Sequence, residues 1–156
     1  MTQTAMTLSQ DASAAIVEAL NQSVAETAVA TMLAQNFHWN VTGMAFGPLH
    51  DLFQKIYEDH FIAQDDLAER IKALDGHAEG TLAGMLKRSK VAEHSGDASD
   101  KEMIKAMMEA QETLASTIAG CGEIAASHGD TLTEDLCIAR GQTHEKFAWF
   151  LRAMLR

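Results

Sequence analysis

Two histidines and two carboxylates stand out in residues 38–70, HWNVTGMAFGPLHDLFQKIYEDHFIAQDDLAER. His38 and His50 lie in the first half of this stretch, and Asp65 and Glu69 lie at its end. Two neutral imidazoles and two carboxylates form a mixed nitrogen and oxygen ligand set, which suits iron, zinc or manganese. These residue types predict a metal site if the fold brings them together.

Three of these residues share one face of a predicted helix with Gln54. At about 100° per residue, Gln54, Asp65 and Glu69 lie roughly 40°, 60° and 100° around the helix from His50. At about 1.5 Å per residue, however, His50 and Asp65 are roughly 22 Å apart along the axis, too far for one ion to bind both. A single chain therefore cannot complete the site with these residues.

A second copy of the helix can complete it. If the copy lies antiparallel across a two-fold axis centred near residues 59 and 60, His50 meets Glu69 of the partner. Gln54 then meets Asp65 of the partner. A two-fold contact is reciprocal, so each dimer would hold two identical sites that draw on both subunits.

The alternative to a metal site is a solvated face of an amphipathic helix, which the charge pattern alone favours. His38 shifts the balance, because it ends the preceding helix and a loop of roughly ten residues can fold it back beside His50. A di-iron site within one chain is disfavoured. Bundle enzymes of that kind supply Glu-x-x-His pairs, and the sequence contains none.

The elements that must position these residues are helices. Apolar residues recur every three or four positions, and no stretch alternates long enough to predict a strand. The third and fourth helices begin at predicted capping boxes, SDKE and TLTE. The sequence thus predicts an all-α protein with long helices over residues 9–37, 48–76, 99–129 and 131–156.

The connections between the helices favour one topology. Short loops predict that the first and second helices, and the third and fourth, form antiparallel hairpins. The connection over residues 76–98 is long enough to travel the length of the bundle, with TLAGMLKR expected to form a short helix. This is a four-helix bundle with one long crossover, the ferritin-like arrangement. At 156 residues we expect a single domain, residues 1–156, with residues 1–8 a flexible tail.

Charge and composition exclude several classes of function. The net charge is −10 and no Lys or Arg precedes Lys55, whereas affinity for DNA depends on cations that neutralise phosphates. No apolar run reaches the roughly 18 residues of a membrane span, and no secretory signal is evident, so we expect a cytoplasmic protein. Cys121 and Cys137 fall within helical patterns without a C-x-x-C spacing, which predicts reduced, packed thiols.

At the candidate ligands the chain resembles the Dps family of miniferritins. The resemblance rests on HWN at residues 38–40, then F, LH and Y, and DLAER at residues 66–70, and it covers nearly the whole chain. It implies a hollow homo-oligomer, a dodecamer, with ferroxidase sites shared between subunits at two-fold axes. Such sites oxidise Fe(II) to Fe(III), preferably with hydrogen peroxide, store the ferric product inside, and need no organic cofactor.

The resemblance also assigns roles to individual residues. It implies that His38 and His50 bind metal from one subunit, and that Asp65 and Glu69 bind it from the two-fold partner. Trp39 matches a tryptophan packed beside the family's site, although ordinary core filling is an equally good account of it.

Gln54 departs from the family pattern, which has an aspartate four residues after the second histidine. An amide oxygen can bind a metal ion but brings no charge, which disfavours binding at the second and weaker metal position. Glu58 or His60 could substitute, but His60 lies about 80° from His50 on the other side of the stripe. We expect His60 near the dimer axis.

HGDTLTED, residues 128–135, contains two aspartates of interest. Asp130 and Asp135 match family positions that line an acidic three-fold pore through which Fe(II) enters. The structural alternative is that Glu134 completes the capping box and Asp135 favours the positive end of the helix. The remaining histidines have no evident partners, and we expect surface or packing roles for His77, His94, His128 and His144.

Two functions from different classes remain. The first is a ferroxidase that stores iron and protects against oxidative stress. The second is a nucleoid-type protein that binds and protects DNA, but family members that bind DNA directly usually carry basic terminal tails, which are absent here. The sequence therefore favours the ferroxidase. An assembled shell with a weakened metal site is a third possibility, which depends on Gln54.

Overall fold

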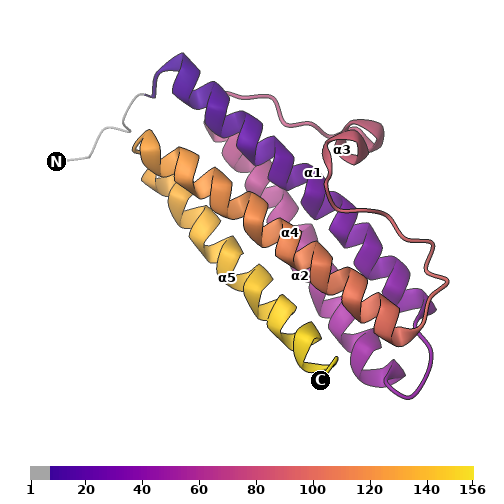
Figure 1. Cartoon of the computed structure of the whole chain (residues 1–156). Coiled ribbons are helices and arrows are strands. Elements are labelled where there is room, and N and C mark those ends of the chain that lie inside the picture. The colour runs from indigo at the N-terminus through magenta and orange to yellow at the C-terminus, as the bar shows by residue number, and fades with distance from the viewer. Residues whose placement is uncertain (1–7) are drawn as a thin grey trace.

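The computed structural model describes residues 8–156 and consists of helices and their connections (Figure 1). No strand occurs among these described residues, and the predicted all-α class is confirmed. The tail predicted for residues 1–8 lies, apart from Leu8, outside the described part of the chain. The helices are α1 (Gln10–Asn40), α2 (Phe46–Ala73), α3 (Leu82–Arg88), α4 (Asp100–Ser127) and α5 (Thr131–Ala153).

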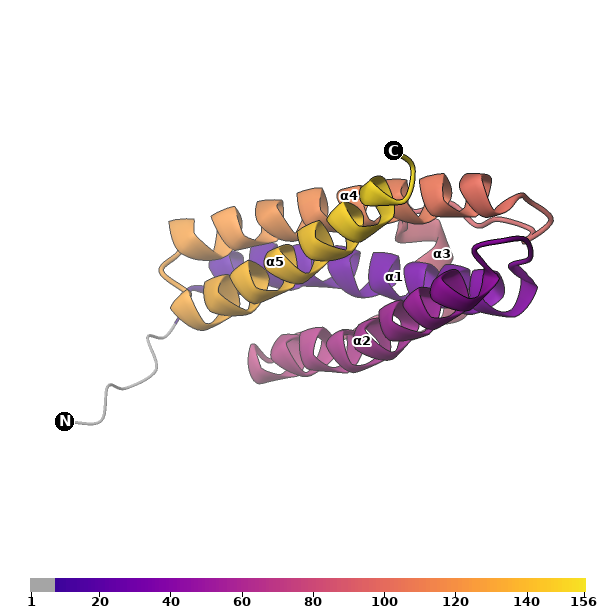
Figure 2. The same cartoon turned by 90° about the horizontal axis from the view of Figure 1, so that it is seen from below.

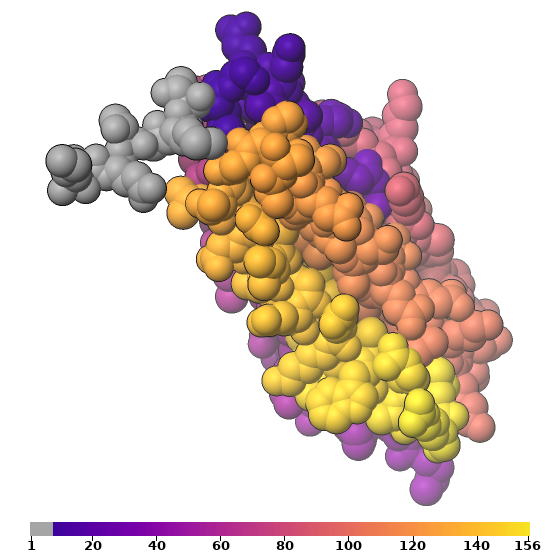
Figure 3. Space-filling model, turned by 60° about the vertical axis from the view of Figure 1, so that its left-hand side comes forward, coloured from indigo at the N-terminus to yellow at the C-terminus, as the bar shows by residue number. Residues whose placement is uncertain are grey.

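The four long helices form the predicted bundle. α1 packs against α2 and α4, and α4 packs against α5 over most of its length. α4 and α5 lie side by side on one face (Figure 3), and the view from below shows α5 beside α4 and α2 beside α1 (Figure 2), with α2 also in contact with α5. The connection between α2 and α4 runs along α1 and carries the short helix α3 (Figure 1). This confirms the ferritin-like topology with one long crossover.

The ends of the helices follow from their capping residues. The Ser9 side chain accepts from Ala12 N at 3.1 Å and begins α1. Ser99 and Glu102 form the predicted capping box at α4, with hydrogen bonds of 3.2 and 2.7 Å. The second predicted capping box is wrong. Asp130 caps α5 by accepting from Thr133 N at 3.1 Å, and the TLTE sequence is already helical.

The hairpin between α1 and α2 brings their ends together. α1 continues to Asn40, three residues further than predicted, because Val41 N donates to the carbonyl of Phe37 at 2.9 Å and closes a last turn. His38 therefore lies on a helix and not in a loop. Gly43 takes a φ of 100°, which glycine adopts without steric cost, and the chain reverses direction within residues 41–45.

A buried apolar cluster fixes this end of the bundle. Phe37 and Leu49 directly precede His38 and His50 and have no exposed surface. The ring of Phe37 packs against that of Phe53, with centroids 5.6 Å apart. Since a well-packed core leaves little freedom to its side chains, the backbone of both histidines is held by the residues beside them.

Midway along the bundle, polar side chains are hydrogen-bonded inside the core. His60 Nδ1 donates to Asp59 Oδ2 at 3.0 Å, and Arg140 donates twice to the same carboxylate at 2.7 and 3.2 Å. Gln111 Nε2 donates to His60 Nε2, and His144 Nδ1 donates to Gln111 Oε1, both at 2.9 Å. His60 is fully buried and points into its own bundle. The alternative that His60 replaces a missing ligand is therefore wrong, whereas its position near a dimer axis stays a prediction.

Burial sets the charge of these groups. It lowers the pKa of His60 more than the neighbouring Asp59 raises it, and it lowers the pKa of His144 to about 2. Burial would raise the pKa of Asp59, but hydrogen bonds from His60 and Arg140 hold it well below its usual range. Both histidines are therefore neutral beside an ionised Asp59–Arg140 pair.

One further prediction is met by the described residues. Cys121 and Cys137 are free thiols and are buried, as the helical pattern predicted. No helix in this part of the chain combines the length and the hydropathy that a membrane crossing needs.

Candidate metal centre

His38 and His50 hold each other in place across the hairpin. His38 Nδ1 donates to the backbone carbonyl of His50, and His50 Nδ1 donates to that of His38, both at 2.8 Å. A carbonyl can only accept, so the hydrogen of each neutral ring lies on Nδ1. Each Nε2 is left with its lone pair, which is the arrangement that metal-binding histidines require.

Aromatic side chains fix the planes of the two rings. The imidazoles of His38 and His50 stack with centroids 3.7 Å apart and an angle of 18°. Phe46 stacks against His50 at 5.1 Å, and the ring of Tyr57 meets His38 edge to face at 5.3 Å. Both histidines are half-buried, so their planes are set by packing while solvent still reaches the site.

Asp65 and Glu69 lie exposed further along α2. The structure brings His38 beside His50 but does not bring either carboxylate to them within one chain. Among residues 8–156, no group of three or more His, Cys, Asp and Glu side chains is placed to hold a metal ion. One chain thus presents a pair of nitrogen donors at one end of α2 and a pair of carboxylates at the other.

Gln54, the departure from the family pattern, is not an isolated amide. Its Nε2 donates to Glu58 Oε1 at 2.8 Å, one helical turn further along the same face. The side chain is half-buried and Glu58 is exposed. The two residues therefore form a pair beside the histidines.

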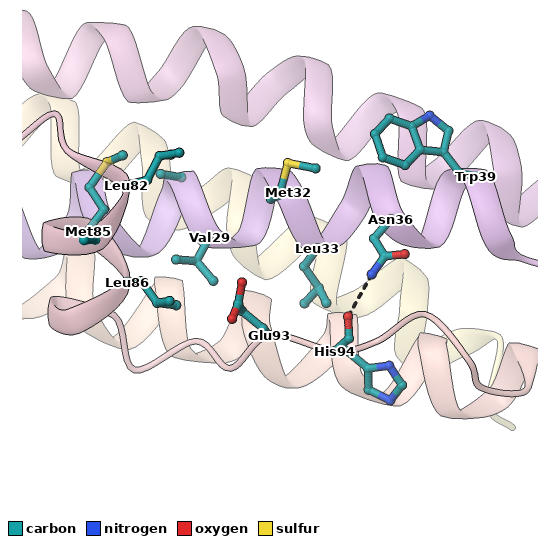
Figure 4. A pocket seen from close by; sticks show the side chains of 12 residues that line it. Val29, Met32, Leu33, Asn36, Trp39, Leu82, Met85, Leu86, Glu93 and His94 are labelled. Atoms are coloured by element: carbon teal, nitrogen blue, oxygen red, sulfur yellow. Dashed lines mark hydrogen bonds between the residues drawn. The ribbon is translucent and has the colours of Figure 1, made fainter.

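Trp39 does not fill the core of its own chain, because 63% of its surface is exposed. It lies at one end of a hollow of about 410 Å³ between α1 and the crossover (Figure 4). Met32 and Leu82, which are 51% and 84% exposed, line the same hollow. Asn36 Nδ2 donates to the carbonyl of His94 at 2.7 Å and ties the crossover to α1 here.

The two candidate pore aspartates differ in their surroundings. Asp130 is buried, accepts from Arg70 Nη2 at 2.9 Å, and is bound by both the amide and the hydroxyl of Thr133. Asp135 is exposed on the first turns of α5. Asp130 is thus a capping residue that also ties α5 to α2, whereas Asp135 is free to face solvent.

Sequence reasoning missed the residues that orient the ligands. Tyr57 follows His50 by seven residues, or about two helical turns, and this spacing could have placed it on the same face. Phe46 gave no such signal, because the predicted helix began at residue 48, whereas α2 begins at Phe46, four residues before His50. Arg70 as the partner of Asp130 had no signal in the sequence either.

The fold and the site define a ferritin-like protein, and comparisons with known proteins agree. The sequence model of the ferritin-like domain matches residues 17–156. General stress protein 20U of Bacillus subtilis (strain 168) is 32% identical, over 90% of this chain and 97% of that protein. DNA protection during starvation protein 2 of Bacillus anthracis is 34% identical, over 90% of this chain and 96% of that protein.

Solved structures extend the comparison to the fold. The Dps protein from Bacillus brevis superposes with a TM-score of 0.91 at 30% identity, over 96% of this chain and all of that one. The Vibrio cholerae O1 protein, described as "a member of a broad superfamily of ferritin-like diiron-carboxylate proteins", has a TM-score of 0.90 at 28% identity, over 99% and 100% of the two chains. The chain belongs to the Dps family of ferritin-like proteins.

Proposed function

We propose that the chain is a miniferritin ferroxidase that oxidises Fe(II) with hydrogen peroxide and stores the ferric product inside a hollow shell of twelve subunits. The observation that carries the proposal is the reciprocal bonding of His38 and His50, which leaves both Nε2 atoms free to bind metal. Asp65 and Glu69 of a two-fold partner complete each site. Trp39 lies beside it.

The exposed apolar surface of one chain supports a partner subunit. Phe61 and Ile62 lie about midway between His50 and Glu69 on α2, and 72% and 63% of their surfaces are exposed. Large apolar side chains gathered on an exposed face mark an interaction surface. A second α2 placed antiparallel about an axis near residues 59 and 60 would cover them and bring the carboxylates to the histidines.

The proposed reaction needs two irons at each site. Each Fe(II) gives one electron, hydrogen peroxide accepts both, its O–O bond breaks, and two protons are taken up to give two water molecules. The carboxylates offset the charge of the ions, and the imidazoles supply directional donors. Iron is the substrate here, and the role of the protein is to hold two ions together where peroxide can reach them.

Protection of DNA is the second candidate function, because the Bacillus anthracis relative carries that name. Direct binding would need several cations per contact. The net charge of −10 and the absence of Lys or Arg before Lys55 oppose it near physiological salt. Consumption of Fe(II) and peroxide by a cytoplasmic protein would protect DNA without contact.

Anomalous diffraction from crystals soaked in Fe(II) tests the proposal. We expect iron peaks within bonding distance of Nε2 of His38 or His50 and of the partner's Asp65 and Glu69. Asp65→Asn is expected to lose the peaks and the rapid oxidation of Fe(II) by peroxide. Iron found elsewhere, or a wild-type oxidation rate in Asp65→Asn, would contradict it.

A further inference from the structure

We propose that Glu58 is a positioning residue that compensates for the missing aspartate at position 54. In this proposal, which rests on the proposed function, Glu58 holds the amide of Gln54 so that its oxygen faces the second metal position. The carboxylate of Glu58 supplies the negative charge from one helical turn further along α2.

The hydrogen bond between the two side chains fixes which end of the amide faces the site. The ionised Glu58 carboxylate can only accept, so the group that faces it must be the NH₂ of Gln54. The distance between Nε2 and Glu58 Oε1 is 2.8 Å. Within residues 8–156, the oxygen of Gln54 makes no hydrogen bond of its own, and it remains available to a metal ion.

Helix geometry directs this oxygen toward the histidines. Side chains on a helix lean toward its N-terminus, so Glu58 reaches back to the level of Gln54, and Gln54 reaches back to the level of His50. With its nitrogen turned toward Glu58, the amide presents its oxygen on the side of His50. The free Nε2 of His50 lies one turn earlier on the same face.

The neighbouring carboxylate of α2, that of Asp59, is bound elsewhere. The carboxylate of Asp59 is bound by Arg140 and His60 and belongs to the core network. Glu58 is the carboxylate that contacts Gln54. A charge held by a hydrogen bond to a ligand raises the electron density on that ligand, and loss of such a partner typically weakens metal affinity about 10- to 100-fold.

Calorimetry with Zn(II), a redox-silent substitute for Fe(II), tests the proposal on the assembled protein. We expect the wild type to bind two ions per site, the second more weakly. Glu58→Gln is expected to weaken the second ion by about tenfold or more and to leave the first unchanged. Glu109→Gln, which removes an exposed carboxylate from α4, is the matched control and should change neither ion.

A rescue variant separates positioning from a structural effect. Gln54→Asp carries its own charge, so the double variant with Glu58→Gln should recover the second ion. Glu58→Asp keeps the charge but is too short to reach the amide, and it should behave like Glu58→Gln. It also provides the test if Glu58→Gln fails to assemble, as judged by light scattering.

Several results would overturn the proposal. Tight binding of the second ion in Glu58→Gln would show that Glu58 has no such role. Retention of the second ion in Gln54→Met would make Glu58 itself the ligand. Failure of the proposed function looks different, because then wild-type protein binds no ion at the histidines and Asp65→Asn changes nothing.

Discussion

Position 54 carries an amide where the family pattern has a carboxylate, and we expect this difference to set the strength of the second metal position. Gln54→Asp brings a formal charge directly to that position, whereas Glu58 acts through a hydrogen bond. We therefore expect Gln54→Asp to bind the second ion more tightly than wild type and to oxidise Fe(II) at a higher initial rate. Calorimetric stoichiometry and stopped-flow absorbance measure the two effects.

Asp65→Asn provides the contrast for this variant, since it removes a ligand that no neighbour replaces and should abolish both effects. If wild type already binds both ions tightly and Gln54→Asp alters neither affinity nor rate, the amide is a fully competent ligand. The charge at position 54 would then be irrelevant to the chemistry.

The pairing of His38 with His50 could be predicted from the sequence, because a short hairpin leaves few places for the end of one helix relative to the start of the next. Their reciprocal bonds to each other's carbonyls could not. Periodicity gives the angle of a residue around a helix and says nothing of side-chain rotamers. The hydrogen bond between Gln54 and Glu58 could not be predicted for the same reason, although the sequence shows that the two residues are four positions apart.

The buried network between α2, α4 and α5 predicts a dependence of stability on pH. His60 and His144 are neutral in the folded chain because burial lowers the pKa of each, that of His144 to about 2. In the unfolded chain they bind protons below about pH 6.5. The contribution of both histidines to the free energy of unfolding is therefore fully present above about pH 6.5. Below that pH it falls with acidification, and the slope for each histidine approaches about 1.4 kcal/mol per pH unit.

His144→Gln tests this dependence, because glutamine keeps an N–H donor for Gln111 but does not titrate. Chemical unfolding between pH 7.5 and 5.5, at one protein concentration, should show a loss of stability that is smaller by about 1.4 kcal/mol over the whole interval. His128→Gln is the matched control at an exposed position and should leave the slope unchanged. An identical slope in His144→Gln would mean that this histidine is protonated in the fold.

Asp130 and Asp135 are expected to separate the stability of α5 from the entry of iron. Asp130→Asn weakens the cap and the ion pair with Arg70, so it should lower the free energy of unfolding by at least about 1 kcal/mol. Asp135→Asn should leave stability within about 0.5 kcal/mol and slow iron uptake at low ionic strength, because steering by charge is screened by salt.

Thermal unfolding and uptake measured at two salt concentrations distinguish these effects. Equal stability of Asp130→Asn and wild type would show that Asp130 does not stabilise α5, and would leave the pore as its only proposed role. An uptake rate that Asp135→Asn leaves unchanged at low salt would remove Asp135 from the pore.

The start of α5 shows why the ends of helices are harder to predict than the helices themselves. Asp130 and Thr131 are both good caps, and the local sequence favoured the threonine because Glu134 follows it at capping-box spacing. In the fold the Asp130 carboxylate is also bound by Arg70, sixty positions away on α2, which favours Asp130 as the cap. The sequence shows both residues but not that they lie close together in the fold. The apolar periodicity of α1, α2, α4 and α5 is a local feature, and it was sufficient to predict these helices.

Assembly is the condition for any activity of this site. A chain whose nitrogen donors and carboxylates lie at opposite ends of one helix has no complete site alone. Light scattering at micromolar concentration should give about twelve times the 16.9 kDa of one chain. A monomer at this concentration would remove the basis of the site, and a stable dimer would retain the site but not the shell.

In the proposed assembly α2 carries ligands of two different sites, and this has a consequence for mixed assemblies. A chain with His38→Ala and His50→Ala and a chain with Asp65→Asn and Glu69→Gln are each expected to be inactive in a pure assembly. In a mixed two-fold pair, one site combines both defects, while the other receives intact histidines from one chain and intact carboxylates from the other. Random co-assembly of equal amounts should therefore restore about a quarter of the sites, measured as Fe(II) oxidation after joint refolding. Restored oxidation from two inactive variants would establish that each site is formed by two chains, and that a single chain cannot oxidise Fe(II).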